Sequence, residues 1–112
     1  MGTAPRFTTL DGEVAARTAS GRRYHEFLQV PDLSAGLYHL EAGAEDSQSP
    51  HAEDEIYLVV RGRSRFRAGP TDTEVGPGSV LFVPALMEHR FHAIEDALDL
   101  LVIFGPAEGT RR

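Results

Sequence analysis

From Arg23 onward, hydrophobic residues occur in short runs that end at glycine, proline or charged turn positions. This spacing is typical of an antiparallel β-sandwich or barrel, and it gives about seven strands. The predicted strands are Tyr24 to Val30, Ala35 to Ala42, Glu55 to Arg61, Ser64 to Ala68, Ser79 to Val83, His89 to Ile94 and Leu98 to Phe104. The pattern therefore predicts an all-β fold with little helix.

Two glycine-containing segments predict tight connections. Arg61-Gly62-Arg63 separates two strand-like runs, and a glycine there can adopt the positive φ of a hairpin turn. Gly76-Pro77-Gly78 predicts a turn before a continuous apolar run that ends at Pro84. Because that run does not alternate, we expect its strand to be buried on both faces.

The ends of the chain lack such patterns. Residues 1–22 are expected to form an arm whose one candidate strand lies around Phe7 to Leu10, residues 23–105 the barrel, and residues 106–112 a polar tail that frays. A chain of 112 residues accommodates one domain of this kind.

Composition narrows the function classes. The formal net charge is −6 and lysine is absent, which argues against a nucleic-acid partner. Cysteine is also absent, so a metal site would use nitrogen and oxygen ligands. No stretch has the pattern of a secretory leader or the length of a membrane span, and we therefore expect a cytoplasmic protein without a membrane partner.

Glu55 is the first candidate functional residue. In a strand it shares one face with Tyr57 and Val59, and a carboxylate on an interior face needs water or a cation. His51 precedes it closely, and His89 begins a separate strand. Two imidazoles and a carboxylate are sufficient for a divalent ion, although five histidines in a short chain make chance pairings easy.

The spacing also matches a known family. Residues 43–62, GAEDSQSPHAEDEIYLVVRG, resemble the first cupin motif, G(x)5HxH(x)3-4E(x)6G. Residues 78–93, GSVLFVPALMEHRFHA, resemble the second, G(x)5PxG(x)2H(x)3N. The resemblance implies an antiparallel jelly-roll barrel and one divalent ion, Fe, Mn, Ni or Zn, bound by His51, Glu55 and His89.

Three motif positions differ from the family pattern. Ser49 replaces the first histidine of the HxH pair, Leu86 replaces a glycine, and Ala93 replaces the final asparagine. We expect Leu86 to avoid the left-handed conformation that glycine would allow. The adjacent Gln48 could supply a carbonyl ligand in place of the missing histidine, but strand alternation favours this only if Pro50 bends the chain.

Other side chains complete the expected site. We expect a small-molecule pocket lined by aromatic residues, with plain core packing as the alternative for each; these residues are Tyr57, Phe82, Phe91 and Phe104. His92 is expected at the surface, and His25 and His39 are expected to be structural.

The resemblance leaves the activity open. Cupins include dioxygenases, isomerases, polyketide cyclases and proteins that only bind ligands, and fold does not choose among them. The sequence thus favours a metal-binding domain acting on a small organic molecule. A non-catalytic ligand- or metal-binding module and a barrel with a vacant site remain alternatives. The resemblance further implies a homodimer, in which the amino-terminal strand could exchange between subunits.

Overall fold

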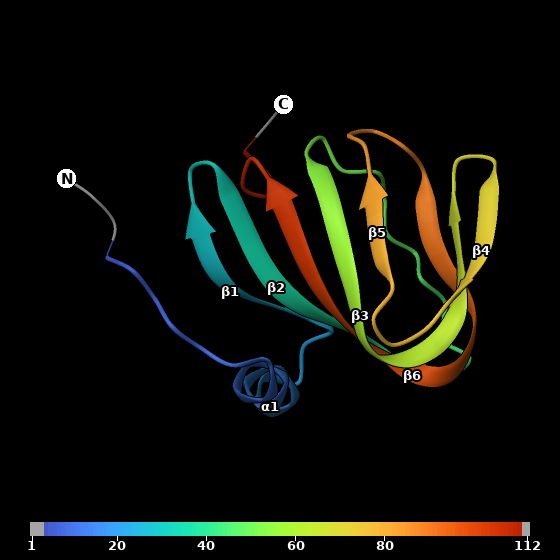
Figure 1. Ribbon diagram of the computed structural model, residues 1–112, viewed down its shortest axis with the longest axis horizontal. Helices are drawn as coiled ribbons and strands as arrows, with labels where there is room; N and C mark the ends of the chain where they lie inside the picture. Colours follow the sequence, from blue (N-terminus) through green and yellow to red (C-terminus); the bar gives the residue numbers. More distant parts are fainter. Residues whose placement is uncertain (1–3, 111–112) are drawn as a thin grey trace.

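A computed structural model of the chain describes residues 4–110, which form one helix and a bent antiparallel sheet (Figure 1). In chain order the elements are α1 (Leu10–Ser20), β1 (Tyr24–Val30), β2 (Leu33–Leu40), β3 (Asp54–Ala68), β4 (Thr71–Val75), β5 (Val80–Val83) and β6 (His89–Gly105). Within these residues the strand order is β1-β2-β6-β3-β4, with β5 on β3. The all-β prediction is confirmed, although the sheet curls without closing.

The two longest strands, β3 and β6, form the centre of the fold. They pair antiparallel from Asp54 with Gly105 at one end to Ala68 with His89 at the other. Both strands bend midway (Figure 1). In one half β6 pairs with β2 and β3 pairs with β5, and in the other half β3 pairs with β4. The sheet therefore wraps around an interior with only two strands continuing through both halves.

Gly62 lies at this bend. Its φ of 100° is a left-handed conformation, and a Cβ there would lie 2.3 Å from the carbonyl oxygen of Ala97. The pairing of β3 with β6 shifts register several times between Val59 and Arg65. The predicted hairpin at Arg61-Gly62-Arg63 is therefore wrong, because the glycine serves a bend inside one continuous strand.

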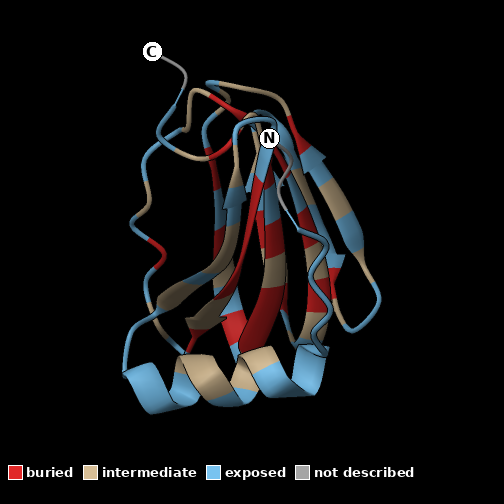
Figure 2. Cartoon of the chain, turned by 90° about the vertical axis from the view of Figure 1, so that its left-hand side faces the viewer, coloured by how far each residue is buried: buried red, intermediate tan, exposed pale blue. Residues whose placement is uncertain are grey.

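The interior is filled by alternate residues of the strands (Figure 2). Its largest buried side chains include Tyr57, Phe91, Leu40, Leu98 and Leu100. Glu55 shares the inward face of β3 with Tyr57 and Val59, as the alternation predicts. A carboxylate is thus brought into a largely apolar interior.

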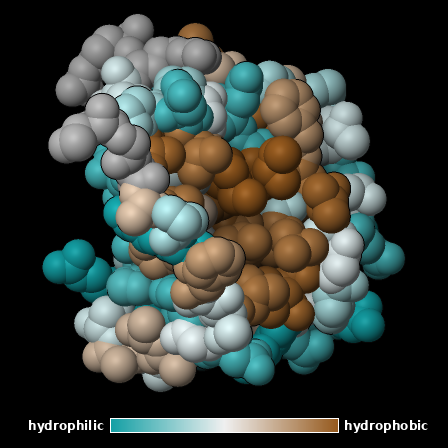
Figure 3. Space-filling view, turned by 60° about the vertical axis from the view of Figure 1, so that its left-hand side comes forward, coloured by the Kyte–Doolittle hydropathy of each residue, from teal (hydrophilic) through white to brown (hydrophobic). Residues whose placement is uncertain are grey.

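The prediction that the β5 run is buried on both faces is wrong. Val80 and Phe82 are 68% and 62% exposed, because β5 is a short strand paired with β3 and these side chains face outward. Ile56, which pairs with both Phe82 and Ile103, is also exposed. Figure 3 shows how hydrophobic side chains gather on one face of the molecule.

Helix α1 was missed at the sequence level, and the strand expected around Phe7 to Leu10 does not form. The Thr9 hydroxyl accepts a hydrogen bond from the Gly12 N–H at 3.0 Å, and Gly21 ends the helix with a φ of 70°. These are ordinary start and stop signals, although the helix buries no residue completely. None of the described helices is long and apolar enough to cross a membrane.

The described part of the carboxyl-terminal tail is docked rather than frayed. Ala107 is buried, and the backbone N–H of Glu108 donates to the Ser34 hydroxyl at 3.0 Å. These contacts hold the start of the tail against the start of β2. As a result the Glu108 side chain lies at the mouth of the interior.

Candidate metal centre

His51, Glu55 and His89 meet in space. One potential ligand atom of each lies within 4.8 Å of the others. Glu55 and His89 lie at the starts of β3 and β6 and are only 2% and 7% exposed, whereas His51 is half-buried in the loop before β3. The fold therefore assembles the three residues that the two motifs indicated.

The Glu55 carboxylate has an unusual environment. Its Oε1 lies 3.1 Å from Nε2 of His89, but the contact lacks hydrogen-bond geometry, and no described residue donates a hydrogen bond to this buried oxygen. A buried carboxylate oxygen without a donor is costly. A cation between the carboxylate and the imidazoles would remove that cost, so the residues present fit a metal ion.

His89 has the orientation of a metal ligand. Its Nδ1 lies 2.8 Å from the backbone oxygen of Met87, which fixes the ring. Nε2 then faces both the Tyr57 hydroxyl, with which it is hydrogen-bonded at 3.1 Å, and Oε1 of Glu55. Burial lowers the pKa of His89, but Glu55 and the Met87 oxygen raise it by more, so the net shift is upward. Without metal, the environment thus favours a proton where a metal would bind.

His51 is held through its backbone as well as its ring. Its carbonyl oxygen accepts a hydrogen bond from Leu86 N–H at 2.7 Å, and its ring packs edge-on against Phe104. Its Nδ1 lies 3.6 Å from a carboxylate oxygen of Glu108. Leu86 has a φ of 69°, so the expectation that it avoids the left-handed region is wrong.

Gln48 presents its amide oxygen to the cluster. Nε2 of Gln48 donates to Asp46 at 2.8 Å, while Oε1 accepts from the Tyr57 hydroxyl at 3.1 Å and lies 3.4 Å from Nε2 of His51. Because a carboxylate can only accept, Asp46 fixes which end of the amide faces inward. Ser49 is exposed, and the irregular chain around Pro50 lets residues 48 and 51 face the same way.

An inner cavity of about 150 Å³ adjoins these residues. Its walls include Tyr57 and Phe104, two of the four expected pocket residues. Phe91 is buried behind the wall, edge-on against Tyr57 with ring centroids 5.0 Å apart. Phe82 lies elsewhere, exposed on the outer face of the sheet.

Four polar residues of this site were not foreseen from the sequence: Tyr24, Tyr38, Asp46 and Glu108. Burial and nearby carboxylates raise the pKa of both Tyr24 and Tyr38, which therefore stay protonated at neutral pH. Asp46 accepts from the Tyr38 hydroxyl, the Gln48 amide and the backbone N–H of Phe91. The one available signal was the alternation that places Tyr24 and Tyr38 on strand faces.

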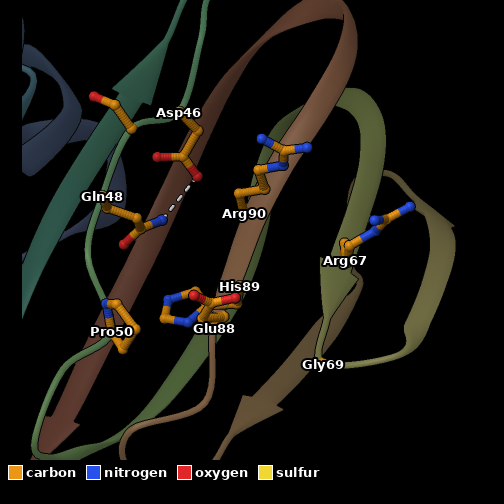
Figure 4. A pocket seen from close by; sticks show the side chains of 9 residues that line it. Asp46, Gln48, Pro50, Arg67, Gly69, Glu88, His89 and Arg90 are labelled. Carbon is orange, nitrogen blue, oxygen red and sulfur yellow. Dashed lines mark hydrogen bonds between the residues drawn. The ribbon is translucent and has the colours of Figure 1, made fainter.

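A second, outer cavity of about 460 Å³ lies on the other side of Gln48 (Figure 4). His89 forms part of its wall, and Arg67 and Arg90 lie at its rim. Although it is larger, it contacts only His89 of the three clustered residues, whereas the inner cavity contacts His51 and Glu55. We therefore regard the inner cavity as the space for a ligand of the cluster.

The remaining histidines lie outside the cluster. His25 is 3.6 Å from Glu13, His39 contacts Asp99 and Glu41, and His92 contacts Asp72 at 2.8 Å. Each is paired with acidic side chains in its own part of the fold.

Comparison with known proteins identifies the family. The family model described as "Cupin domain" matches residues 36–104, which is more than half of the chain. The chain is a cupin. The match includes His51, Glu55 and His89 and ends within β6.

This cupin has relatives in sequence and in structure. It is 48% identical over 99 residues to "Uncharacterized protein SCO3923" of Streptomyces coelicolor, covering 88% of this chain and 94% of that protein. A cupin 2 conserved barrel domain protein from Rhodopseudomonas palustris aligns with a TM-score of 0.67 and 19% identity, over 81% of this chain and 68% of the other.

Two further structures carry functional names. KdgF from Halomonas sp. aligns with a TM-score of 0.67 and 23% identity, over 74% of this cupin and 76% of KdgF. The DMSP lyase DddQ from Ruegeria pomeroyi aligns with a TM-score of 0.66 and 22% identity, over 74% of this cupin and 47% of the lyase. At these identities the likeness establishes the fold alone.

Proposed function

We propose that this cupin binds one divalent metal ion through His51, Glu55 and His89, with the amide oxygen of Gln48 as a fourth ligand. The observation that carries the proposal is the buried Oε1 of Glu55, which lacks a hydrogen-bond donor and faces an imidazole nitrogen. Asp46 supports it by directing the Gln48 oxygen toward the same point.

The donor set favours a borderline cation. Two imidazoles, a carboxylate and an amide oxygen suit Fe²⁺, Mn²⁺, Ni²⁺ or Zn²⁺, and the chain contains no cysteine that would select a softer ion. The set leaves coordination positions free for a ligand from the inner cavity.

The proposed activity is metal-dependent conversion of a small organic molecule. A bound divalent ion supplies a Lewis acid that polarises a ligand oxygen. The protein supplies the orientation: Val102 and Phe104 form an apolar wall of the inner cavity, while Tyr24, Tyr38 and Tyr57 contribute hydroxyl-bearing rings. Such a cavity, mostly apolar with a few polar groups, is typical of small-molecule sites.

Metal content tests the proposal. The wild type, purified without chelators and reconstituted separately with each of the four ions, is expected to retain about one equivalent by mass spectrometry. His51→Ala should lose it and Gln48→Ala should bind more weakly, whereas His92→Ala, remote from the cluster, should retain it. Absence of metal from the wild type after every reconstitution contradicts the proposal.

Turnover separates the enzyme from a storage or binding module. If the metal-loaded protein binds small carbonyl or hydroxy compounds stoichiometrically but converts none of a broad panel, the non-catalytic module is favoured. Metal-dependent turnover that His51→Ala abolishes favours the enzyme.

We further infer that the protein forms a homodimer. The support is the exposed apolar outer face, where Ile56, Phe82 and Ile103 are neighbours on three adjacent strands. Large exposed apolar patches are uncommon on monomers and typical of interfaces. A second copy would cover this face without obstructing the inner cavity, which lies on the opposite side of the sheet.

A further inference from the structure

The three tyrosines of the inner cavity differ in what their hydroxyl groups contact. Tyr38 donates to Asp46 at 2.8 Å, and Tyr57 donates to Gln48 at 3.1 Å. The Tyr24 hydroxyl is buried and has no hydrogen-bond partner among the described residues. Since burying an unpaired hydroxyl costs folding free energy, we expect this group to hydrogen-bond to a ligand.

The Tyr24 ring is held in place by the local sequence. A Cβ at Gly36, on the adjacent strand, would lie 2.4 Å from both Cζ and the hydroxyl oxygen of Tyr24. Only glycine therefore leaves room for the phenol at this point of β2. Tyr38 packs edge-on against the same ring, with centroids 6.3 Å apart.

Two orphaned polar atoms thus belong to residues that line one cavity. Oε1 of Glu55 lacks a donor and the hydroxyl of Tyr24 lacks an acceptor among the described residues. Both residues line the space of about 150 Å³. A ligand oxygen bound to a metal at Glu55 would supply that acceptor.

We propose that Tyr24 donates a hydrogen bond to the oxygen of a small neutral carbonyl compound, an aldehyde or ketone, bound in the inner cavity. The inference rests on the proposed function, because the same oxygen would face the metal. Tyr24 then binds the substrate and stabilises negative charge that develops on its oxygen.

The charges around the cavity favour a neutral ligand. Glu55 and Glu108 line it, and Asp46 lies behind Gln48. Glu55 and Glu108 together can balance the two positive charges of a divalent ion, which leaves no excess charge to attract an anion.

The volume limits the ligand size. A space of about 150 Å³ is comparable to cavities that hold benzene, and hence suits a ligand of about five or six non-hydrogen atoms. Butanone and propanoate both have that size, and they differ in charge and in the nature of the oxygen.

The experiment uses Mn²⁺-loaded protein and follows paramagnetic relaxation of the methyl protons of butanone and of propanoate. We expect saturable butanone binding, weaker propanoate binding, and a loss of butanone affinity of about tenfold in Tyr24→Phe at unchanged metal content. Gly36→Ala, which displaces the ring, should also weaken butanone binding. Unchanged butanone affinity in Tyr24→Phe overturns the assignment of Tyr24, and propanoate binding as tight as butanone overturns the neutral ligand.

Thermal unfolding without ligand separates this role from a structural one. Removing an unpaired hydroxyl should leave the Tm of Tyr24→Phe equal to that of the wild type or higher, whereas a lower Tm contradicts the inference. If the wild type takes up no metal, the proposed function fails. Saturation-transfer NMR with butanone on the metal-free protein then decides this inference separately: Tyr24-dependent transfer supports it, and absence of transfer overturns it.

Discussion

The backbone N–H of Leu86 donates to the carbonyl oxygen of His51 at 2.7 Å, and this bond joins the two loops that carry the histidines of the metal centre. To make it, Leu86 adopts a φ of 69°, a region that a non-glycine residue enters at a cost. The family pattern has glycine here, and the chain keeps the glycine conformation without the glycine. Positioning of His51 is therefore obtained with strain at Leu86.

Leu86→Gly should stabilise the protein by about 1 kcal/mol, because it relieves the left-handed strain and the Leu86 side chain is 72% exposed. For a domain of this size that corresponds to a Tm increase of roughly 4–8 °C. Leu86→Ala is the matched control, since it shortens the side chain and keeps the strain. Equal Tm values for the two variants would contradict this explanation.

Gly62→Ala should destabilise the fold by at least ~3 kcal/mol, because the new Cβ combines a forbidden φ with a 2.3 Å approach to the Ala97 oxygen. Gly78→Ala is the control. Gly78 has a φ of 89°, but a Cβ added there would have no atom within 4 Å, so it should suffer the backbone strain alone. Urea unfolding of both variants measures the difference, and similar losses would show that the bend tolerates a side chain.

Asp46→Asn should weaken metal binding by about tenfold, in the range expected for a residue that orients a ligand. The asparagine can no longer accept from Tyr38, Gln48 and Phe91 together, so the Gln48 amide is free to turn. Competition with a chromophoric chelator measures the affinity. Glu45→Gln removes a neighbouring exposed charge as a control and should leave the affinity near the wild-type value.

The stability of the β3–β4 region should decrease at acidic pH. Burial raises the pKa of Asp72, but its bonds to Arg65 and His92 lower it by more, so the net shift is downward. A lowered pKa means that the contribution is present above the unfolded-state pKa of about 3.9 and is lost as pH falls through the folded-state value.

Asp72→Asn should consequently be less stable than the wild type near neutral pH and lose that deficit in acid. Chemical unfolding at several pH values measures it. Asp32→Asn, a change in the exposed turn between β1 and β2, should show no such convergence.

Phe82→Glu should convert the inferred dimer to a monomer, because it places a charge on the apolar outer face while leaving the cavity walls intact. Analytical ultracentrifugation measures the change, and Val80→Thr provides a milder variant of the same face. A wild type that sediments as a monomer at all concentrations would contradict the inferred homodimer.

The fold class and the three clustered residues could be predicted because they depend on local signals. His51, Glu55 and His89 lie at fixed spacings from glycine and proline residues. Those spacings can be read from the sequence without any knowledge of the tertiary structure. The alternation of β3 correctly placed Glu55 with Tyr57 on the inward face.

Other features depend on contacts that the sequence does not reveal. A positive φ at Gly62 fits a hairpin and a bend equally well, and only the pairing of β3 with β6 distinguishes them. Phe82 faces outward because β5 is a short strand beside β3, which its apolar run could not show. Tyr24 and Asp46 reach the site through cross-strand and loop contacts, so neither carries a local motif.

The residues of the proposed metal centre come from opposite ends of the paired strands β3 and β6. Glu55 lies near one end of this ribbon, whereas His89 lies at the other end, opposite Ala68. Measured along β3, positions 55 and 68 would be about 43 Å apart in a straight strand at ~3.3 Å per residue, yet Oε1 of Glu55 and Nε2 of His89 are 3.1 Å apart. An ion bound by both side chains would therefore link the two ends of the ribbon across the interior.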